Sequence, residues 1–407
     1  MWVGAFVATS PFSAFLTPMS DGLGWSKTTL NGAQAVGTIL AGLSAPLAGQ
    51  LVDRYGTRLV LTAAGLAMSL ALLLCANVQE PWQFVVGFSL GRVVFQGVIQ
   101  IATPTAVANW FIAQRGRATG LALTGNAASV AVCVPLIQYV VDTAGWRTAW
   151  LVLAAMALVM LTPTAALLLR NRPEDLGLLP DGRKPAAGEL TPSAMSPTSA
   201  SETAERGDVS WRLGRALRTR TFWLLLSAGG LSSLTVAGVT THQMPLLLEN
   251  GLPPGLAASM VSAYAICWTL GGVGWGFVGE RIPVRYALAF IYSAGAVATV
   301  ILLQSYSALP ALAFAVLYGL TVGGASTLEA VIWADYYGRA SLGSIRGFAR
   351  PFLMGANAVG PLAAGMAVDA LGSYELPYKG FVVTALCAAV LILLARPPSA
   401  TAATDRG

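Results

Sequence analysis

The sequence has 407 residues, of which 55% are hydrophobic and only 10% are charged. An ordinary soluble domain has roughly 25% charged residues, so this composition argues against a soluble globular protein and indicates a polytopic membrane protein. The formal net charge of +6 does not indicate nucleic-acid binding, because most basic residues lie in segments between apolar runs.

Apolar runs recur along the whole chain, and a membrane-spanning helix needs about 20 mainly apolar residues. No basic segment opens the chain, so we expect a first membrane helix rather than a cleaved signal; whether Met1 is the true start stays open. The sequence predicts an all-α protein with twelve spans, at about 2–20, 29–51, 59–78, 82–106, 118–141, 148–170, 222–246, 256–278, 284–303, 309–333, 348–368 and 378–395.

The longest polar segment covers residues 171–221 and separates two six-helix halves, 1–170 and 222–397. Its middle, "ELTPSAMSPTSASETAE", has too few apolar residues to fold, which predicts a disordered linker. Its end places Arg212, Arg215 and Arg218 on one helical stripe, which suits a helix on an anionic membrane surface. Residues 398–407 form a short tail.

The basic residues set the expected orientation, since inner segments carry the excess of lysine and arginine. With the N-terminus inside, outer segments hold only Lys27, Arg147 and Lys379. We therefore expect both termini, the linker and the tail on the cytoplasmic side of an inner or plasma membrane. The arginines assigned to the inner side are Arg54, Arg58, Arg115, Arg117, Arg281, Arg285, Arg339, Arg346 and Arg350.

An internal repeat relates the two halves. "GQLVDRYGTR" begins at Gly49 and "GFVGERIPVR" begins at Gly276, 227 positions later, with Asp53 matched by Glu280. "VDTAGW" and "VDALGSY" show the same spacing, whereas "RGRA" at 115–118 matches "RGFA" at 346–349 with a spacing four residues longer. Six spans, a linker and six related spans predict two parallel halves with a substrate path between them.

These segments resemble the major facilitator superfamily, whose signature between helices 2 and 3 is similar to "GQLVDRYGTR". Other segments resemble its monocarboxylate and oxalate:formate porter branch: "GLGWSKTTL", "VANWFIAQRGRATGLAL", "RPEDLGLLPDG", "THQMPLLLENGL" and "YYGRASLGSIRG". The resemblance implies a secondary transporter that works by alternating access, commonly as a monomer. Two departures leave the substrate open, since Gly272 occupies the position of a helix 8 arginine of this branch and the first span has no lysine.

Arg92 is the basic residue inside a span, where a charge costs several kcal/mol unless it faces a cavity or a partner. Gln96 and Thr103 lie on roughly the same helical face, and Gln100 lies near its edge. We expect Arg92 to line a cavity and to pair with an anionic substrate or take part in coupling. The alternative is a structural hydrogen bond to neighbouring carbonyl groups.

Two other ionisable residues lie in spans. Glu329, near the inner end of its span, suggests an inner-surface clamp to Arg281 or Arg285, with proton coupling as the alternative. His242, the only histidine, is expected to line a gate or the cavity, with coupling again the alternative.

Further polar or amphipathic groups on expected cavity helices could line the cavity or pack between helices: Asn126, Tyr264, Trp268 and Asn357. The four cysteines are scattered singly, and His242 has no ligand partner at metal spacing, so no metal site or disulfide framework is expected. No GxxxxGK[ST] motif occurs, and the Gly-rich runs favour close helix packing.

The leading hypothesis is a secondary transporter for a small organic anion such as a mono- or dicarboxylate, with no cofactor and no catalytic residue. The expected partners are the small-molecule substrate and the bilayer, while a co-transported proton, the direction and symport or antiport stay open. The alternatives are a porter for a neutral or hydrophobic solute, a transporter-like sensor and a membrane-embedded enzyme. The lack of a metal cluster and of paired intramembrane acids in the sequence argues against the enzyme.

The charged repeat segments are expected to gate transport. Asp53 ends its helix, where the helix dipole disfavours a carboxylate, so we expect it to reach a basic residue or a helix N-terminus of the other half, near Arg346 or Arg350. Glu280 should mirror it toward Arg115 or Arg117. As the resemblance implies, such contacts stabilise the outward-facing state and break as the halves move. The gating set is Asp53, Arg54, Arg58, Arg115, Glu280, Arg281, Arg285, Glu329 and Arg346.

Overall fold

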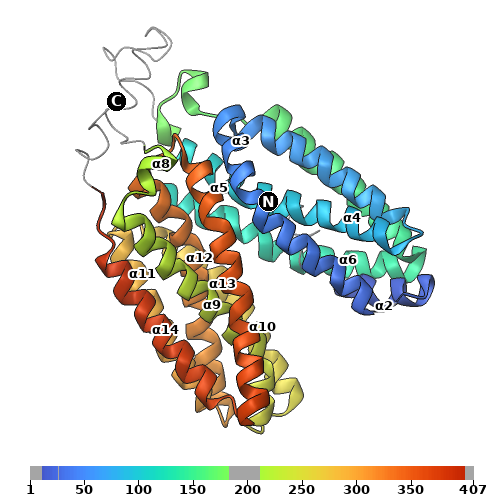
Figure 1. Ribbon diagram of the computed structural model, residues 1–407, viewed down its shortest axis with the longest axis vertical. Coiled ribbons are helices and arrows are strands. Elements are labelled where there is room, and N and C mark those ends of the chain that lie inside the picture. Colours follow the sequence, from blue (N-terminus) through green and yellow to red (C-terminus); the bar gives the residue numbers. More distant parts are fainter. Residues whose placement is uncertain (1–11, 26, 183–210, 399–407) are drawn as a thin grey trace. The chain divides into compact units, whose positions relative to one another are not determined.

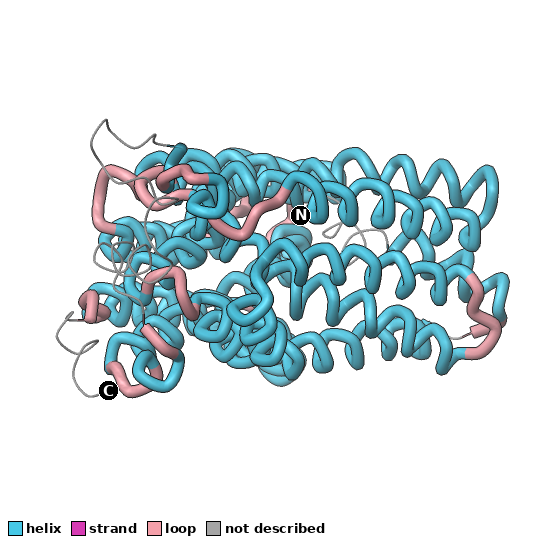
Figure 2. The backbone as a smooth tube through the Cα atoms, turned by 90° about the horizontal axis from the view of Figure 1, so that it is seen from above, coloured by secondary structure: helices cyan, strands magenta, loops and turns pink. Residues whose placement is uncertain are grey.

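The computed structural model describes residues 12–25, 27–182 and 211–398. Figure 2 shows that these residues are almost entirely helical, without a β-strand among them. The predicted all-α polytopic fold is confirmed. The linker middle expected to be disordered and most of the tail lie outside the described residues, as does the first part of the first predicted span.

Two glycines divide long helices into pairs of spans. Helix α3 runs from Lys27 to Ala76 but breaks at Gly56, whose φ of 80° and ψ of 161° are not helical. Helix α6, Arg115–Met156, breaks in the same way at Gly145, with φ 83° and ψ 163°. Both positions need glycine because a side chain disfavours a positive φ. The sequence predicted turns at these two places.

The remaining helices of the N-terminal half of the sequence are short or contain wide turns. The fourth span is continuous from Pro81 to Trp110 but includes a π-helical segment, in which Gln100 N–H donates to Phe95 O. Wider turns also follow α6, on either side of Pro163, which lacks a donor N–H. The elements are α2 (Phe12–Leu23), α4 (Pro81–Arg92), η1 (Val93–Ile99), α5 (Gln100–Trp110), η2 (Ala157–Leu161), η3 (Thr164–Leu168), η4 (Pro173–Leu176) and η5 (Pro180–Gly182).

The C-terminal half of the sequence forms six long helices after one short turn of helix. This turn, α8, spans only Leu213–Ala216, so it is shorter than the three-arginine helical stripe expected there. Trp211 just before it is buried, and its N–H donates to Tyr337 O at 3.0 Å. The long helices are α9 (Arg220–Glu249), α10 (Pro254–Val278), α11 (Val284–Leu303), α12 (Ala308–Tyr337), α13 (Leu342–Leu371) and α14 (Glu375–Leu394).

The helices gather in two compact units, and each unit takes one short segment from the other half of the sequence. The first unit comprises 1–112, 125–208 and 339–350; the second comprises 113–124, 209–338 and 351–407. Within the first, α3 packs along α4, and within the second, α10 packs along α12 and α11 along α14 (Figure 1). The exchanged segments are the N-terminal ends of α6 and α13.

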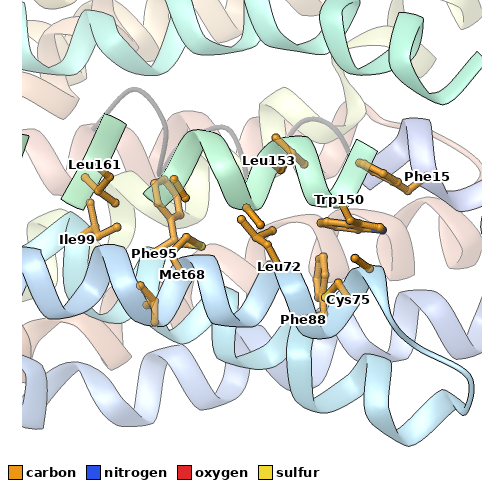
Figure 3. Close-up of a cluster of buried hydrophobic side chains, with 14 of the residues drawn as sticks. Phe15, Met68, Leu72, Cys75, Phe88, Phe95, Ile99, Trp150, Leu153 and Leu161 are labelled. Carbon is orange, nitrogen blue, oxygen red and sulfur yellow. The ribbon is translucent and has the colours of Figure 1, made fainter. Parts of the chain in front are cut away.

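Each unit has an apolar core of its own. In the first unit Phe15 stacks on Trp150 with ring centroids 4.1 Å apart, and both side chains are almost fully buried. Figure 3 shows this cluster, in which Phe88, Leu72 and other buried side chains meet between α3, α4 and α6. In the second unit Phe314 stacks on Tyr318 at 5.2 Å.

Large apolar side chains also cover much of the outer surface. Along α3, Leu43 is 67% exposed and Leu47 is 64% exposed. Nine helices of the described chain are long and apolar enough to cross a membrane. Exposed leucines at helical spacing are costly in water and favourable in lipid, so these faces are lipid-facing. The chain is a multi-pass membrane protein.

Candidate functional site

Arg92, the basic residue predicted to line a cavity, is the last residue of α4 and is 6% exposed. Its Nη2 donates a hydrogen bond to Thr38 Oγ1 on α3 at 2.8 Å. Its guanidinium lies 6.0 Å from the centroid of the Phe88 ring. Gly37 permits this close packing, because a Cβ at that position would lie 2.9 Å from Arg92 Cγ. Helices α3 and α4 thus hold a buried guanidinium within a membrane span, beside a small cavity that Phe88 and Trp150 also line.

Gln96, Gln100 and Thr103 continue a polar face along the same span, at positions i, i+4 and i+7. Gln96 Oε1 and Thr103 Oγ1 are buried, and neither has a hydrogen-bond partner in the described part of the chain. Gln100 Oε1 accepts a hydrogen bond from Nη2 of Arg350 on α13. The sequence grouped Arg350 with the inner-surface arginines, and that placement was wrong, since its guanidinium packs against this polar face.

Asp53 caps a helix from the other half of the sequence. Its two carboxylate oxygens accept hydrogen bonds from the backbone N–H groups of Gly343, at 2.9 Å, and Ser344, at 2.7 Å. These groups belong to the first turn of α13, where N–H groups have no partner within the helix. The negative charge also faces the positive end of the helix dipole. We call this contact the Asp53 latch; a helix N-terminus is one of the two partners that the sequence predicted.

Glu280 makes the equivalent contact in the second unit. Its Oε1 accepts from the Arg117 N–H at 3.0 Å, and its Oε2 lies 2.5 Å from Arg117 Nε. Beside it, Arg115 Nη1 forms an ion pair with Asp335 Oδ1 at 2.6 Å. Arg117, one of the two partners that the sequence predicted, thus binds Glu280, whereas the other, Arg115, pairs with Asp335, which was not considered from the sequence.

Glycines bring the backbones together at both contacts. A Cβ on Gly343 would lie 2.6 Å from Gly49 O, and a Cβ on Gly116 would lie 2.2 Å from Gly276 O. Gly276 follows Gly49 by 227 positions, and Gly343 follows Gly116 by the same number. Ser344 also follows Arg117 by 227 positions. The predicted match of "RGRA" with "RGFA", four residues out of this register, is therefore wrong, because the structural equivalent of residues 115–118 is 342–345.

The other arginines of the repeat segments lie close to the helix ends. Arg54 packs over Tyr55 at 5.3 Å, and Arg285 over Tyr286 at 4.6 Å. Arg58 donates through its N–H to Asn171 Oδ1 at 2.8 Å and through Nε to Ala166 O at 2.9 Å. Arg281 is exposed, and Arg346 is partly buried on α13.

Glu329 lies in the core of the second unit. Its Oε1 accepts hydrogen bonds from Ser232 Oγ of α9 at 2.9 Å and from Tyr292 OH of α11 at 2.7 Å. Both donor residues are buried. These hydrogen bonds join α12 to α9 and α11 through hydroxyl groups, in place of the expected clamp to Arg281 or Arg285.

The remaining predicted cavity residues are spread over the second unit. His242 Nε2 lies 3.1 Å from Pro361 O, and Asn357 Nδ2 donates to Ser233 O at 3.4 Å. Tyr264 stacks on Tyr318 at 6.0 Å, while Trp268 is 37% exposed. Asn126 lies outside the residues whose side chains are described.

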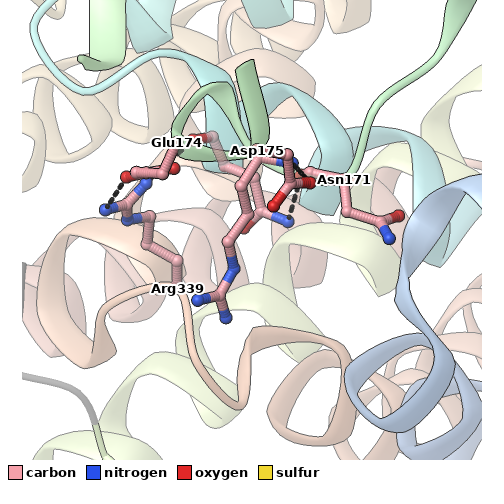
Figure 4. Close-up of polar contacts among 6 residues, drawn as sticks. Asn171, Glu174, Asp175 and Arg339 are labelled. Carbon is pink, nitrogen blue, oxygen red and sulfur yellow. Dashed lines mark hydrogen bonds and ion pairs between the residues drawn. The ribbon is translucent and has the colours of Figure 1, made fainter. Parts of the chain in front are cut away.

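The first residues of the linker form an ordered cap on the first unit. Trp110 Nε1 donates to Arg170 O at 2.8 Å, and Asp181 Oδ1 accepts from Ile112 N–H at 3.2 Å. Figure 4 shows Glu174 of this cap directed at Arg339, whose Nη2 lies 3.1 Å from Glu174 Oε1. Arg339 also donates to Asn109 O at 2.9 Å. The "RPEDLGLLPDG" segment thus binds an arginine from the C-terminal half of the sequence.

Comparisons with known proteins agree with this architecture. A model of the Major Facilitator Superfamily matches residues 1–250. The chain belongs to the major facilitator superfamily. Monocarboxylate transporter 11 of Homo sapiens is 28% identical over 351 residues, covering 82% of this chain and 68% of that protein. The oxalate:formate antiporter of Oxalobacter formigenes is 24% identical over 340 residues, covering 81% and 73%.

The fold is shared with solved facilitator structures. The human organic anion transporter MFSD10 aligns with a TM-score of 0.69 at 15% identity, over 96% of this chain and 97% of that one. At this identity the likeness establishes the fold alone. The relatives are transporters and not enzymes, so this facilitator is a transporter too, as the sequence indicated.

Gly272, where the resembled branch has an arginine, lies in a contact between helices. Gly272 O accepts a hydrogen bond from Thr327 Oγ1 at 3.1 Å, and a Cβ on Gly120 would lie 2.7 Å from the same oxygen. Helices α6, α10 and α12 therefore meet around this glycine.

Proposed function

We propose that this facilitator carries a small organic anion, with a mono- or dicarboxylate as the substrate class. The observation that supports it most is Arg92, a guanidinium 6% exposed inside a membrane span. Placing arginine at the centre of a spanning helix costs about 3 kcal/mol on insertion scales, so such residues generally serve a pathway or a partner. The names of the relatives, monocarboxylate transporters and an oxalate:formate antiporter, point to the same class.

Alternating access is the mechanism we propose, with a gradient as the energy source. The Asp53 latch and the Glu280–Arg117 contact would hold one state and break as the two halves of the sequence move. Both contacts lie at helix ends for which the positive-inside bias predicts the cytoplasmic surface. We further propose that both termini face the cytoplasm and that the membrane is the inner or plasma membrane.

A porter for a neutral or hydrophobic solute is the second candidate. Gly272 favours it, because the arginine of the resembled branch is missing from that position and no other residue of α10 is basic. A carrier of neutral solutes would need no positive charge in its cavity, so the role of Arg92 distinguishes the two candidates.

Uptake of radiolabelled carboxylates into proteoliposomes tests the proposal. The panel comprises L-lactate, pyruvate, oxalate, succinate and benzoate, and Arg92→Ala is compared with Arg396→Ala, which removes an exposed arginine. We expect saturable uptake of at least one carboxylate, a loss of tenfold or more in kcat/KM for Arg92→Ala, and little change for the control. No uptake of any carboxylate, or uptake unchanged in Arg92→Ala, would refute the anion assignment.

A further inference from the structure

Arg350 differs from the other arginines that connect the halves of the sequence. Arg115, Arg117 and Arg339 each lie within 3.1 Å of a carboxylate oxygen. Arg350 lies inside a candidate membrane span, Leu342–Ala370, and its hydrogen bond goes to the neutral amide of Gln100. Among the residues that the structure describes, no acidic side chain forms an ion pair with it.

The guanidinium of Arg350 is also incompletely satisfied. Its Nε is buried and makes no hydrogen bond within the described chain. A charge removed from water without a counter-ion is costly, and a purely structural arginine generally recovers that cost through a carboxylate or several carbonyl groups. An arginine that keeps a donor unused and has no acid beside it is chemically suited to an incoming anion.

Polar residues near Gln100 on the fourth span share this incompleteness. Gln96 Oε1 and Thr103 Oγ1, on the same face as Gln100, are buried without a partner in the described residues. Buried polar atoms are nearly always hydrogen-bonded, so several unsatisfied atoms on one polar face indicate a place where water or a polar ligand binds. The hydroxyl of Thr103 and the amide of Gln96 can donate to a carboxylate.

The depth of this cluster separates it from Arg92. Gln100 follows Arg92 by eight residues, which is about 12 Å along a helix, toward the end of the span at Trp110. A carboxylate of a few carbon atoms is shorter than this distance. We therefore expect the anion to contact the two arginines one after the other.

We propose that Arg350 is a second anion-binding residue, which binds the substrate carboxylate on the cytoplasmic side of Arg92. Gln100 holds the guanidinium in the absence of substrate and releases a donor when the anion arrives. This inference rests on the proposed anion transport and adds a substrate-contacting residue from α13. It also explains how the facilitator functions without an arginine at Gly272.

Transport measured separately from each face of the membrane tests the inference. Right-side-out and inverted membrane vesicles present the outer and the cytoplasmic face to a labelled carboxylate from the panel above. Arg350→Gln removes the charge, whereas Gln100→Glu leaves Arg350 in place and supplies an internal carboxylate that competes with substrate. Arg396→Gln is the matched control for loss of an arginine. Arg350→Lys keeps the positive charge but lacks the planar guanidinium group.

The expected result is specific to one face. In inverted vesicles, Arg350→Gln and Gln100→Glu should each raise KM about ten- to a hundredfold, the range for loss of a charge-assisted contact, while KM in right-side-out vesicles stays within about twofold. Gln100→Glu should also raise the thermal midpoint, because it adds an ion pair, so its loss of function could not be attributed to unfolding.

Three results would overturn the inference, and one would go further. The first is a KM in inverted vesicles that neither variant changes. The second is an equal rise in KM on both faces, and the third is a rise in KM on the outer face alone. Each contradicts an anion contact at Arg350 on the cytoplasmic side. If Arg92→Ala still impairs transport in these cases, the proposed function stands. If wild-type vesicles of both kinds take up no carboxylate, the proposed function fails, and the inference fails with it.

Discussion

The Asp53 latch gives the most direct test of the gating hypothesis. Asp53→Asn keeps the shape of the side chain but removes its charge and one acceptor oxygen. The carboxylate now accepts from two N–H groups, at 2.9 Å and 2.7 Å, at the positive end of α13. An asparagine oxygen can accept from one of them, and its amide nitrogen cannot accept from the other.

The free energy that Asp53→Asn removes from the latched state can be estimated from these contacts. A hydrogen bond to a charged group contributes about 1.5–3 kcal/mol, and one such bond is removed. Since 1.4 kcal/mol corresponds to a factor of ten, the latched state should lose about ten- to a hundredfold in population relative to the unlatched state. The substrate-binding residues proposed here lie elsewhere on the chain, so binding should persist.

Two measurements check this expectation. Carboxylate uptake into proteoliposomes should show kcat reduced severalfold or more, and binding measured by calorimetry should show Kd changed by less than about threefold. Asp142→Asn is the matched control, because that exposed carboxylate accepts from Gln138 on its own helix. A normal kcat, or a lost affinity with a normal kcat, would refute the latch.

Three further perturbations probe neighbouring contacts. Exchanging the charges of the ion pair, Arg115→Asp with Asp335→Arg, should restore part of the uptake that each single variant loses, and no rescue would mean that the pairing is irrelevant to transport. Gly343→Ala should lower the thermal midpoint and uptake because its Cβ would lie 2.6 Å from both Asp53 Oδ1 and Gly49 O, whereas Gly355→Ala, with nothing within 4 Å, should be neutral. Glu329→Leu should lower the thermal midpoint more than Glu329→Gln, because leucine leaves two buried hydroxyl donors without their acceptor, at about 1–3 kcal/mol each; equal midpoints would contradict this.

The sequence predicted the helices and the repeat contacts well because both depend on strong local signals. Apolar runs of spanning length define the helices, and Gly56 and Gly145 divide them where the chain turns. The partner of Asp53 followed from the helix dipole. A carboxylate is unfavourable at the C-terminal end of its own helix and favourable at the N-terminal end of another, where the N–H groups have no partner within the helix.

The partners of buried polar groups could not be predicted in the same way. Glu329 could be placed near the inner end of its span, but which neighbour it contacts depends on how α12 is rotated against α9 and α11. Arg350 was assigned to the surface because it lies near the start of its span. The π-helical turn at Val93–Ile99 also widens this span locally, and periodicity at 3.6 residues per turn does not reveal it.

The two repeat contacts share a geometry but differ in strength. At both, glycines allow backbone contact and an acidic residue accepts from the first turn of a helix. Glu280 gains an ion pair with Arg117, whereas Ser344, at the equivalent place, offers Asp53 no charge. An ion pair with one partner 45% exposed adds at most about 1 kcal/mol, whereas the second N–H bond that Asp53 accepts contributes about 1.5–3 kcal/mol. Of the two contacts that the proposed cycle breaks, the Glu280 contact should therefore yield first, and substitution of Asp53 should change the population of the latched state more than substitution of Glu280.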